Sequence, residues 1–241
     1  ITNFIPAFLT DGICKQIKLL EKWISKSKSS FSVGVLGGIK KEKFTIGLSG
    51  LINNYDYIIP GGAVLNTLLN SLGINIGGSS IYSDDSDIIK LSEKIINNKN
   101  LYKKILFPKS IVIVNESLKQ RKTIMFQDIN KINLKDFIIV DFSITSNTES
   151  ILKTASLNKG KLLMAGPPSY CKNGFINGTK QIIKYFGQNH KNSILLGGDT
   201  VSEVESKTIK SSGGGAALQY ICKQKLPILE ALKENKLKFD L

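Results

Sequence analysis

The chain has 241 residues, of which 41% are hydrophobic and 22% are charged, so it can bury a full core and is not a disordered protein. No apolar run reaches the roughly 18 residues that a membrane-spanning helix needs. The formal net charge of +14 favours an anionic partner, such as a nucleotide, a nucleic acid, an anionic lipid or an acidic protein surface, although a bias toward Lys, Asn and Ile explains it equally.

Hydrophobic periodicity predicts an alternation of helices and strands along the whole chain. The predicted elements, in chain order, are a helix at 14–24, a strand at 31–36, a helix at 44–51, a strand at 57–59, helices at 63–72 and 87–96, strands at 106–114 and 137–141, a helix at 148–155, a strand at 161–164, a helix at 178–186, a strand from 194 and a helix at 216–222. This alternation predicts one α/β domain over residues 1–241, a Rossmann-like three-layer αβα fold with a mostly parallel sheet.

Four predicted strands end in glycine turns, namely Gly37-Gly38, Gly61-Gly62, Gly166-Pro167 and Gly197-Gly198. In an open α/β sheet the carboxyl ends of the strands share one edge, where ligands bind. Four such turns predict a phosphate or nucleotide crevice. The chain has no Walker A motif and no complete G-x-G-x-x-G, so it is neither a P-loop protein nor a standard dinucleotide fold. The same glycines are also explained by close packing of helices on strands without any ligand.

The segment from Ile194 to Thr200 is a buried apolar strand followed by two glycines, a carboxylate and a hydroxyl. A glycine turn before a helix lets backbone N–H groups approach a phosphate, and Asp199 is a suitable oxygen ligand for Mg²⁺. An Asp-Thr pair after a strand is also typical of a helix N-cap. The sequence leaves both roles of Asp199 open.

These turns and several further motifs occur in a fixed order. The ordered set is Gly37-Gly38-Ile39-Lys40, Gly61-Gly62-Ala63, Ile76-Gly77-Gly78-Ser79, Gly166-Pro167, Gly178-Thr179, Gly197-Gly198-Asp199-Thr200, Ser212-Gly213-Gly214-Gly215-Ala216 and Leu226-Pro227. In order and spacing it resembles the C-terminal, nucleotide-binding domain of phosphoglycerate kinases, over nearly the whole chain.

The resemblance implies a fold of that C-terminal-domain type and a role for each matched residue. Glycines 38, 61 and 62 are expected to face adenine, Lys40 to touch the transferred phosphate, and Thr200 to meet phosphates. Mg-ATP or Mg-ADP is the implied cofactor. The implied site comprises catalytic Lys40, Gly198, Gly213 and Gly214, nucleotide-binding Gly38, Lys43, Gly61, Gly62, Gly166, Pro167, Gly197, Thr200 and Gly215, and the metal ligand Asp199.

The chain departs from the family pattern at functional positions. Ala165 stands where the family has an asparagine that contacts phosphate, and Lys172 stands where a glutamate accepts the ribose hydroxyls. Ile39 replaces a small alanine beside adenine. We also expect the family's N-terminal substrate domain to be absent, since Asn3–Leu20 already resembles the helix that enters the C-terminal domain.

Three functions follow as hypotheses. The first is a divergent, catalytically degenerate nucleotide-binding domain that serves as a binding or structural subunit. The second is the C-terminal half of an active ATP:3-phosphoglycerate phosphotransferase. Its other half is then either missing from this sequence or supplied by another chain. The third is a basic interaction subunit of a larger protein or ribonucleoprotein assembly. Cys14, Cys171 and Cys222 form no C-x-x-C motif, which predicts a reducing, intracellular compartment.

Overall fold

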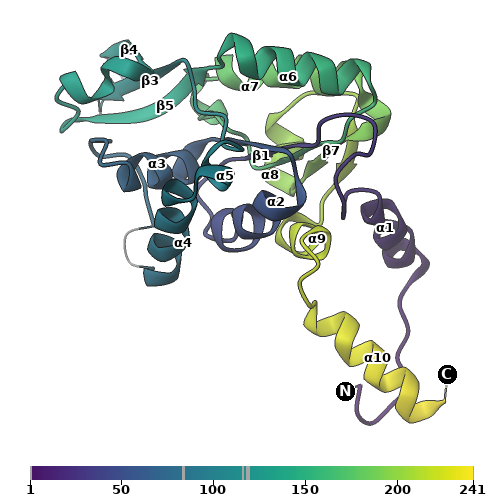
Figure 1. Ribbon diagram of the computed structural model, residues 1–241. Helices are drawn as coiled ribbons and strands as arrows, with labels where there is room; N and C mark the ends of the chain where they lie inside the picture. The colour runs from purple at the N-terminus through teal and green to yellow at the C-terminus, as the bar shows by residue number, and fades with distance from the viewer. Residues whose placement is uncertain (1, 83–84, 116, 118–119, 241) are drawn as a thin grey trace.

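Five parallel strands form the main sheet of the computed structural model, which describes residues 2–82, 85–115, 117 and 120–240 (Figure 1). The strand order is β2-β1-β6-β7-β8. The bounds are β1 Val33–Leu36, β2 Tyr57–Pro60, β6 Leu162–Ala165, β7 Ser193–Leu196 and β8 Ile209–Ser211. All five strands therefore place their carboxyl ends on the same edge, as the glycine turns predict.

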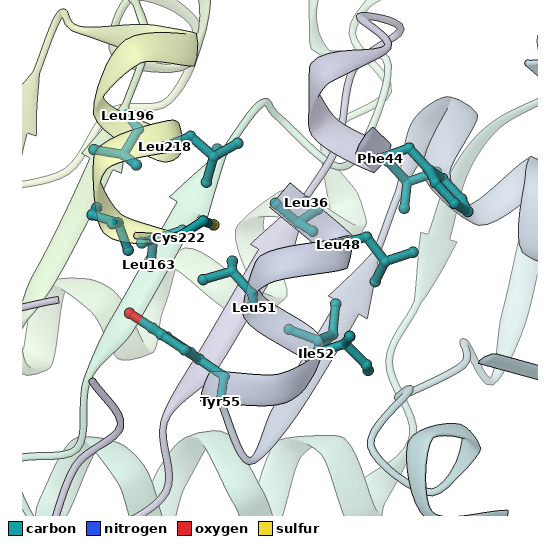
Figure 2. Close-up of a cluster of buried hydrophobic side chains, with 14 of the residues drawn as sticks. Leu36, Phe44, Leu48, Leu51, Ile52, Tyr55, Leu163, Leu196, Leu218 and Cys222 are labelled. Atoms are coloured by element: carbon teal, nitrogen blue, oxygen red, sulfur yellow. The ribbon is translucent and has the colours of Figure 1, made fainter. Parts of the chain in front are cut away.

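Alternate side chains of these strands enter two separate cores, because successive residues of a strand face opposite sides of the sheet. Val35 and Leu195 contribute to one core and Leu36 and Leu163 to the other. The first core is covered by α6 (Ser146–Leu157) and α7 (Asn177–Gln188). The second core is covered by η1 (Lys43–Leu48), α2 (Ser49–Asn54) and α9 (Gly214–Ile221), and Figure 2 shows how Leu51 and Leu218 contribute to it. The predicted three-layer α/β fold is confirmed.

A second, antiparallel sheet lies beside the main one and was not predicted from the sequence. Its order is β4-β3-β5, with β3 at Ser110–Asn115, β4 at Arg121–Met125 and β5 at Phe137–Ser143. The apolar sequences of β3 and β5 do not indicate that the two strands pair in antiparallel directions. Strand β4 was missed altogether because only Ile124 of its five residues is buried, so it has no apolar run.

Helix α3 (Gly62–Ser71) joins the two sheets, since its side chains enter two cores. Ala63 and Val64 pack into the core over the main sheet, whereas Leu65 and Leu69 pack with the apolar face of the antiparallel sheet. The other described helices are α1 Asp11–Glu21, α4 Ser86–Asn97, α5 Lys99–Tyr102, η2 Phe126–Lys131, η3 Cys171–Asn173, η4 His190–Asn192, α8 Gly198–Glu203 and α10 Pro227–Phe239.

The two ends of the described chain lie side by side, away from the two sheets (Figure 1). Asn235 of α10 joins them: its Oδ1 accepts from the Ala7 amide at 2.8 Å and its Nδ2 donates to the Ile5 carbonyl at 2.7 Å. Lys238 Nζ donates to the Asn3 carbonyl at 2.8 Å. Pro227 thus opens a terminal helix that the sequence did not predict.

Across the residues described, no helix combines the length and the apolar character that a membrane span requires. All three cysteines are free thiols, and only Cys222 is buried.

Candidate functional site

The turns after β1 and β2 are hydrogen-bonded to each other at the carboxyl edge of the sheet. The Gly61 amide donates to the Leu36 carbonyl at 2.8 Å, and the Ala63 amide donates to the Gly38 carbonyl at 3.0 Å. These bonds fix the start of α3 against the β1 turn, so the backbone that forms the edge is held rigidly.

Several of the predicted glycines are required by this close backbone packing. A Cβ on Gly62, whose φ is +51°, would lie 2.6 Å from the Gly38 carbonyl oxygen, and a Cβ on Gly61 would lie 2.5 Å from Pro168. Gly166, with φ of +88°, likewise faces the backbone of the β1 turn. At these positions glycine is explained by the fold without a ligand.

Other predicted glycines face open space. A Cβ added to Gly38 or Gly198 would meet no heavy atom within 4 Å among the described residues. Gly197 has a φ of +96°, which favours glycine, and a Cβ there would lie 3.4 Å from the Gly214 Cα, in ordinary van der Waals contact. The β7 turn and the start of α9 therefore meet backbone to backbone beside an open space.

That space is a cavity of about 660 Å³ bounded by the strand-ending turns, α3 and β5. Most of the predicted site residues line it: Gly38, Lys40, Lys43, Gly62, Gly166, Pro167, Gly197, Gly198, Asp199, Thr200, Gly214 and Gly215. Gly61 and Gly213 do not line it, because Gly61 packs on Pro168 and Gly213 is the N-cap of α9. The volume suits a nucleotide-sized ligand.

Lys40 and Asp199, which both line the cavity, form an ion pair. The Lys40 ammonium lies 3.3 Å from Asp199 Oδ2, and both side chains are about 60% exposed, at 62% and 60%. An exposed pair of this kind contributes only about 0–1 kcal/mol to stability. The two charges are therefore held near one another at little energetic cost, and both remain available to a ligand.

Asp199 is not the N-cap of α8, which corrects one of the two roles that the sequence left open. The N-cap is Gly197, which has no side chain to cap the helix, and Asp199 is the second residue of the first turn. The described residues contain no group of three or more His, Cys, Asp or Glu side chains placed to hold a metal. A single exposed carboxylate nonetheless fits Mg²⁺, which is commonly held by one or two carboxylates together with phosphates and water.

Thr200 lines the cavity, but its hydroxyl is engaged with the backbone. Its Oγ1 donates to the Leu196 carbonyl at 2.7 Å and accepts from the Gly166 amide at 2.9 Å. The side chain is 1% exposed. Thr200 therefore fastens α8 to the β6 turn and holds Asp199 in place.

Lys43 enters the cavity from η1, a π-helix, and π-helical turns often occur at functional sites. The residue is 7% exposed, and burial lowers the pKa of its ammonium, an effect that Lys40 adds to and that Glu42 and Asp199 oppose. A mostly buried cation at the cavity wall attracts an anionic ligand more strongly than a surface lysine does.

We expect the substitution Lys43→Met to stabilise the fold at pH 7, because it removes a mostly buried charge whose desolvation is unfavourable. The pKa is lower in the folded chain than in the unfolded chain, so stability from this group rises as pH increases toward 10.5. The stability gain of the variant is therefore largest at pH 7 and shrinks toward pH 10.5.

Urea unfolding at neutral and at high pH measures this dependence. Lys90→Met, which changes an exposed lysine of α4, is the matched control and should leave the stability unchanged at both pH values. A stability difference between Lys43→Met and the parent chain that is equal at both pH values contradicts the argument.

Asp141 is a cavity residue that sequence reasoning missed. Its Oδ1 accepts from the Gly178 amide at 2.9 Å and its Oδ2 from the Asn177 amide at 2.8 Å, so it caps the start of α7. No local signal could have found this role, because the capped helix begins 36 residues later in the chain.

The residues that depart from the family pattern lie in two environments. Ala165 is fully buried within the core and does not reach the cavity. Ile39 lines the cavity and is 73% exposed. Lys172 also lines the cavity, and its ammonium lies 3.5 Å from Glu203 Oε1.

A family model described as Phosphoglycerate kinase matches residues 1–224. The chain is 33% identical over 231 residues to a phosphoglycerate kinase of Wigglesworthia glossinidia brevipalpis, covering 92% of this chain and 55% of that protein. It is 26% identical over 243 residues to one of Dictyoglomus turgidum, covering 98% of this chain and 60% of that protein. The chain thus spans little more than half the length of these relatives.

Solved structures of the same family share the fold. The phosphoglycerate kinase of Pyrococcus horikoshii OT3 superposes with a TM-score of 0.75 at 23% identity, over 98% of this chain and 60% of that one. That of Coxiella burnetii gives a TM-score of 0.72 at 21% identity, over 92% and 58%.

Proposed function

The chain belongs to the phosphoglycerate kinase family, and from that premise we propose that its cavity binds Mg-ADP or Mg-ATP while the domain itself has no phosphotransferase activity. In this proposal the chain serves as a binding or structural subunit. The observation that carries it is the convergence of Lys40, Lys43 and Asp199 from two separate strand ends on one cavity.

The charges of the cavity support binding of a magnesium–phosphate group. Asp199 would hold the Mg²⁺, which neutralises phosphate oxygens when bound. Lys40 and Lys43 would contact the phosphates, and the open positions at Gly38 and Gly198 leave the backbone approachable. These residues bind and orient phosphates, which is what phosphoryl transfer asks of a protein.

The loss of catalysis is proposed from the departures. Ala165 has no polar group where the family has an asparagine, and Arg121, the one arginine of the sequence, lies on β4 with its guanidinium 5.7 Å from the Phe175 ring centre. Arg121 does not line the cavity. A cavity whose lining includes no arginine lacks the planar, bidentate donor that binds phosphate most strongly, so it stabilises a transferred phosphate less well.

Isothermal titration of the chain with Mg-ADP tests the proposal. We expect binding in the micromolar to millimolar range, with no ATP formed from ADP and 1,3-bisphosphoglycerate in a coupled assay. Absence of heat at millimolar nucleotide overturns the binding proposal.

An active C-terminal half is the alternative, favoured by the placement of Lys43 at the cavity wall. In that case, adding the N-terminal half of a family member should restore phosphotransferase activity to the mixture. Activity that also depends on Lys40 would replace the degenerate interpretation with this one.

A basic interaction subunit is the second alternative, and the net charge of +14 is the observation behind it. It requires RNA binding whose affinity falls steeply with salt. Filter binding to a structured RNA at two salt concentrations distinguishes it from nucleotide binding.

A further inference from the structure

A second carboxylate lies on the wall of the cavity, one helical turn beyond Asp199. Glu203 is the last residue of α8, four positions after Asp199, and both line the cavity. Residues four apart on a helix share a face and are separated by about 6 Å along the axis. Helix α8 therefore presents two acceptor groups in a row to any ligand in the cavity.

The two carboxylates differ in their surroundings. The Asp199 side chain is 60% exposed, whereas that of Glu203 is 15% exposed. Among the residues that the structure describes, no backbone amide donates to Glu203, and its ionic neighbour is the Lys172 ammonium at 3.5 Å, whose own side chain is 67% exposed. Asp141, by contrast, has its carboxylate filled by amides of α7. Glu203 thus keeps acceptor capacity that the fold does not use.

From this geometry we infer that Glu203 accepts hydrogen bonds from the ribose hydroxyls of the bound nucleotide, with Lys172 holding the carboxylate in place. The inference rests on the proposed function and names a specificity residue for the same cavity. If Asp199 holds a Mg²⁺-bound phosphate, Glu203 lies about 6 Å further along the same helix face, a distance that a nucleoside diphosphate can span between its phosphates and its sugar. Hydroxyl groups donate to carboxylates, and such charge-assisted bonds are stronger in a poorly solvated place.

This arrangement explains why a lysine is tolerated at position 172. The ammonium group of lysine has no acceptor atom, so it cannot accept a hydrogen bond from a ribose hydroxyl. The structure places a carboxylate from a different element against it, so the acceptor reaches the cavity from α8 instead of from the loop after β6. In this pair, Lys172 orients the Glu203 carboxylate, and Glu203 accepts the hydrogen bonds from the ribose hydroxyls.

The test compares ADP with 2′-deoxy-ADP, both as magnesium complexes, by isothermal titration. We expect the parent chain to bind ADP about tenfold more tightly than 2′-deoxy-ADP, and Glu203→Ala to reduce that ratio to about one. Glu203→Gln keeps a carbonyl acceptor and should give an intermediate ratio. We use the ratio of the two Kd values because Lys172, once freed from Glu203, would raise the affinity for ADP and for 2′-deoxy-ADP alike.

Glu205→Ala is the matched control, because Glu205 is exposed two residues further on and does not line the cavity. It should leave the ratio unchanged. A parent chain that binds both nucleotides equally, or a Glu203→Ala variant that keeps the tenfold ratio while remaining folded by circular dichroism, overturns this inference and leaves the proposed function standing. Binding of neither nucleotide to the parent chain overturns the proposed function itself.

Discussion

The substitution Asp199→Ala is expected to weaken Mg-ADP binding at least tenfold and, at the same time, to strengthen binding of ADP without divalent cations. Removal of even an outer partner of a metal ligand commonly costs 10–100-fold in affinity, so loss of the ligand itself costs no less. The second effect follows from the 3.3 Å contact with Lys40, because the variant frees that ammonium to meet phosphate. Titration in Mg²⁺ and in EDTA measures both effects.

Opposite signs under the two conditions are the distinguishing result. A variant that had simply lost its fold would lose binding in both buffers. Ser202→Ala removes an exposed hydroxyl of the same helix that donates to the Asp199 backbone carbonyl at 3.0 Å, and it leaves the carboxylate in place. It serves as the control for damage to α8 and should change neither titration. If Asp199→Ala binds Mg-ADP as the parent chain does, Asp199 is not the metal ligand.

The substitution Gly62→Ala is expected to destabilise the fold by about 2–4 kcal/mol, which is a large effect for one methyl group. The backbone of Gly62 is left-handed at φ of +51°, and the added Cβ would lie 2.6 Å from the Gly38 oxygen and 2.8 Å from the Gly38 nitrogen. Both obstacles are backbone atoms, which cannot rotate away. A chain of this size loses roughly 2–4 °C in Tm per kcal/mol, so the expected loss is about 4–16 °C.

Gly187→Ala provides the control for this prediction. Gly187 lies near the end of α7, and a Cβ there would meet no atom within 4 Å among the residues described. Alanine favours a helix over glycine by up to about 1 kcal/mol, so this variant should be neutral or slightly more stable. Equal Tm values for the two variants would show that the fold does not need glycine at position 62. Ligand binding would then be the remaining explanation for this glycine.

Local pattern was enough to predict four of the five strands of the main sheet, β1, β2, β6 and β7, and the turns that follow them. The strand before Gly197 is a run of apolar residues, and the turn after it is marked by two glycines and Asp199. Because the carboxyl ends of parallel strands share an edge, these local signals also predict where the cavity lies. Strand β8, by contrast, has three residues and only one of them is buried, so no periodicity marks it.

The parts of the site that could not be predicted depend on contacts between distant segments. Glu203 and Lys172 are 31 positions apart and meet only because α8 and the loop after β6 lie at the same sheet edge. The burial of Lys43 follows from its place in η1, whose π-helical geometry gives no sequence signal. The surroundings of the glycines were likewise hidden, since Gly38 and Gly62 look alike in the sequence. Both have a positive φ, of +79° and +51°, but only Gly62 also packs tightly against backbone atoms.

The side-chain amide of Asn235 joins α10 to the segment that contains Ile5 and Ala7. The contact with Ala7 spans 228 positions, so it depends on the tertiary structure and not on local sequence. Removal of residues 2–7 would therefore leave the Asn235 side chain, which is 2% exposed, without its Ala7 and Ile5 partners, and it would destabilise α10.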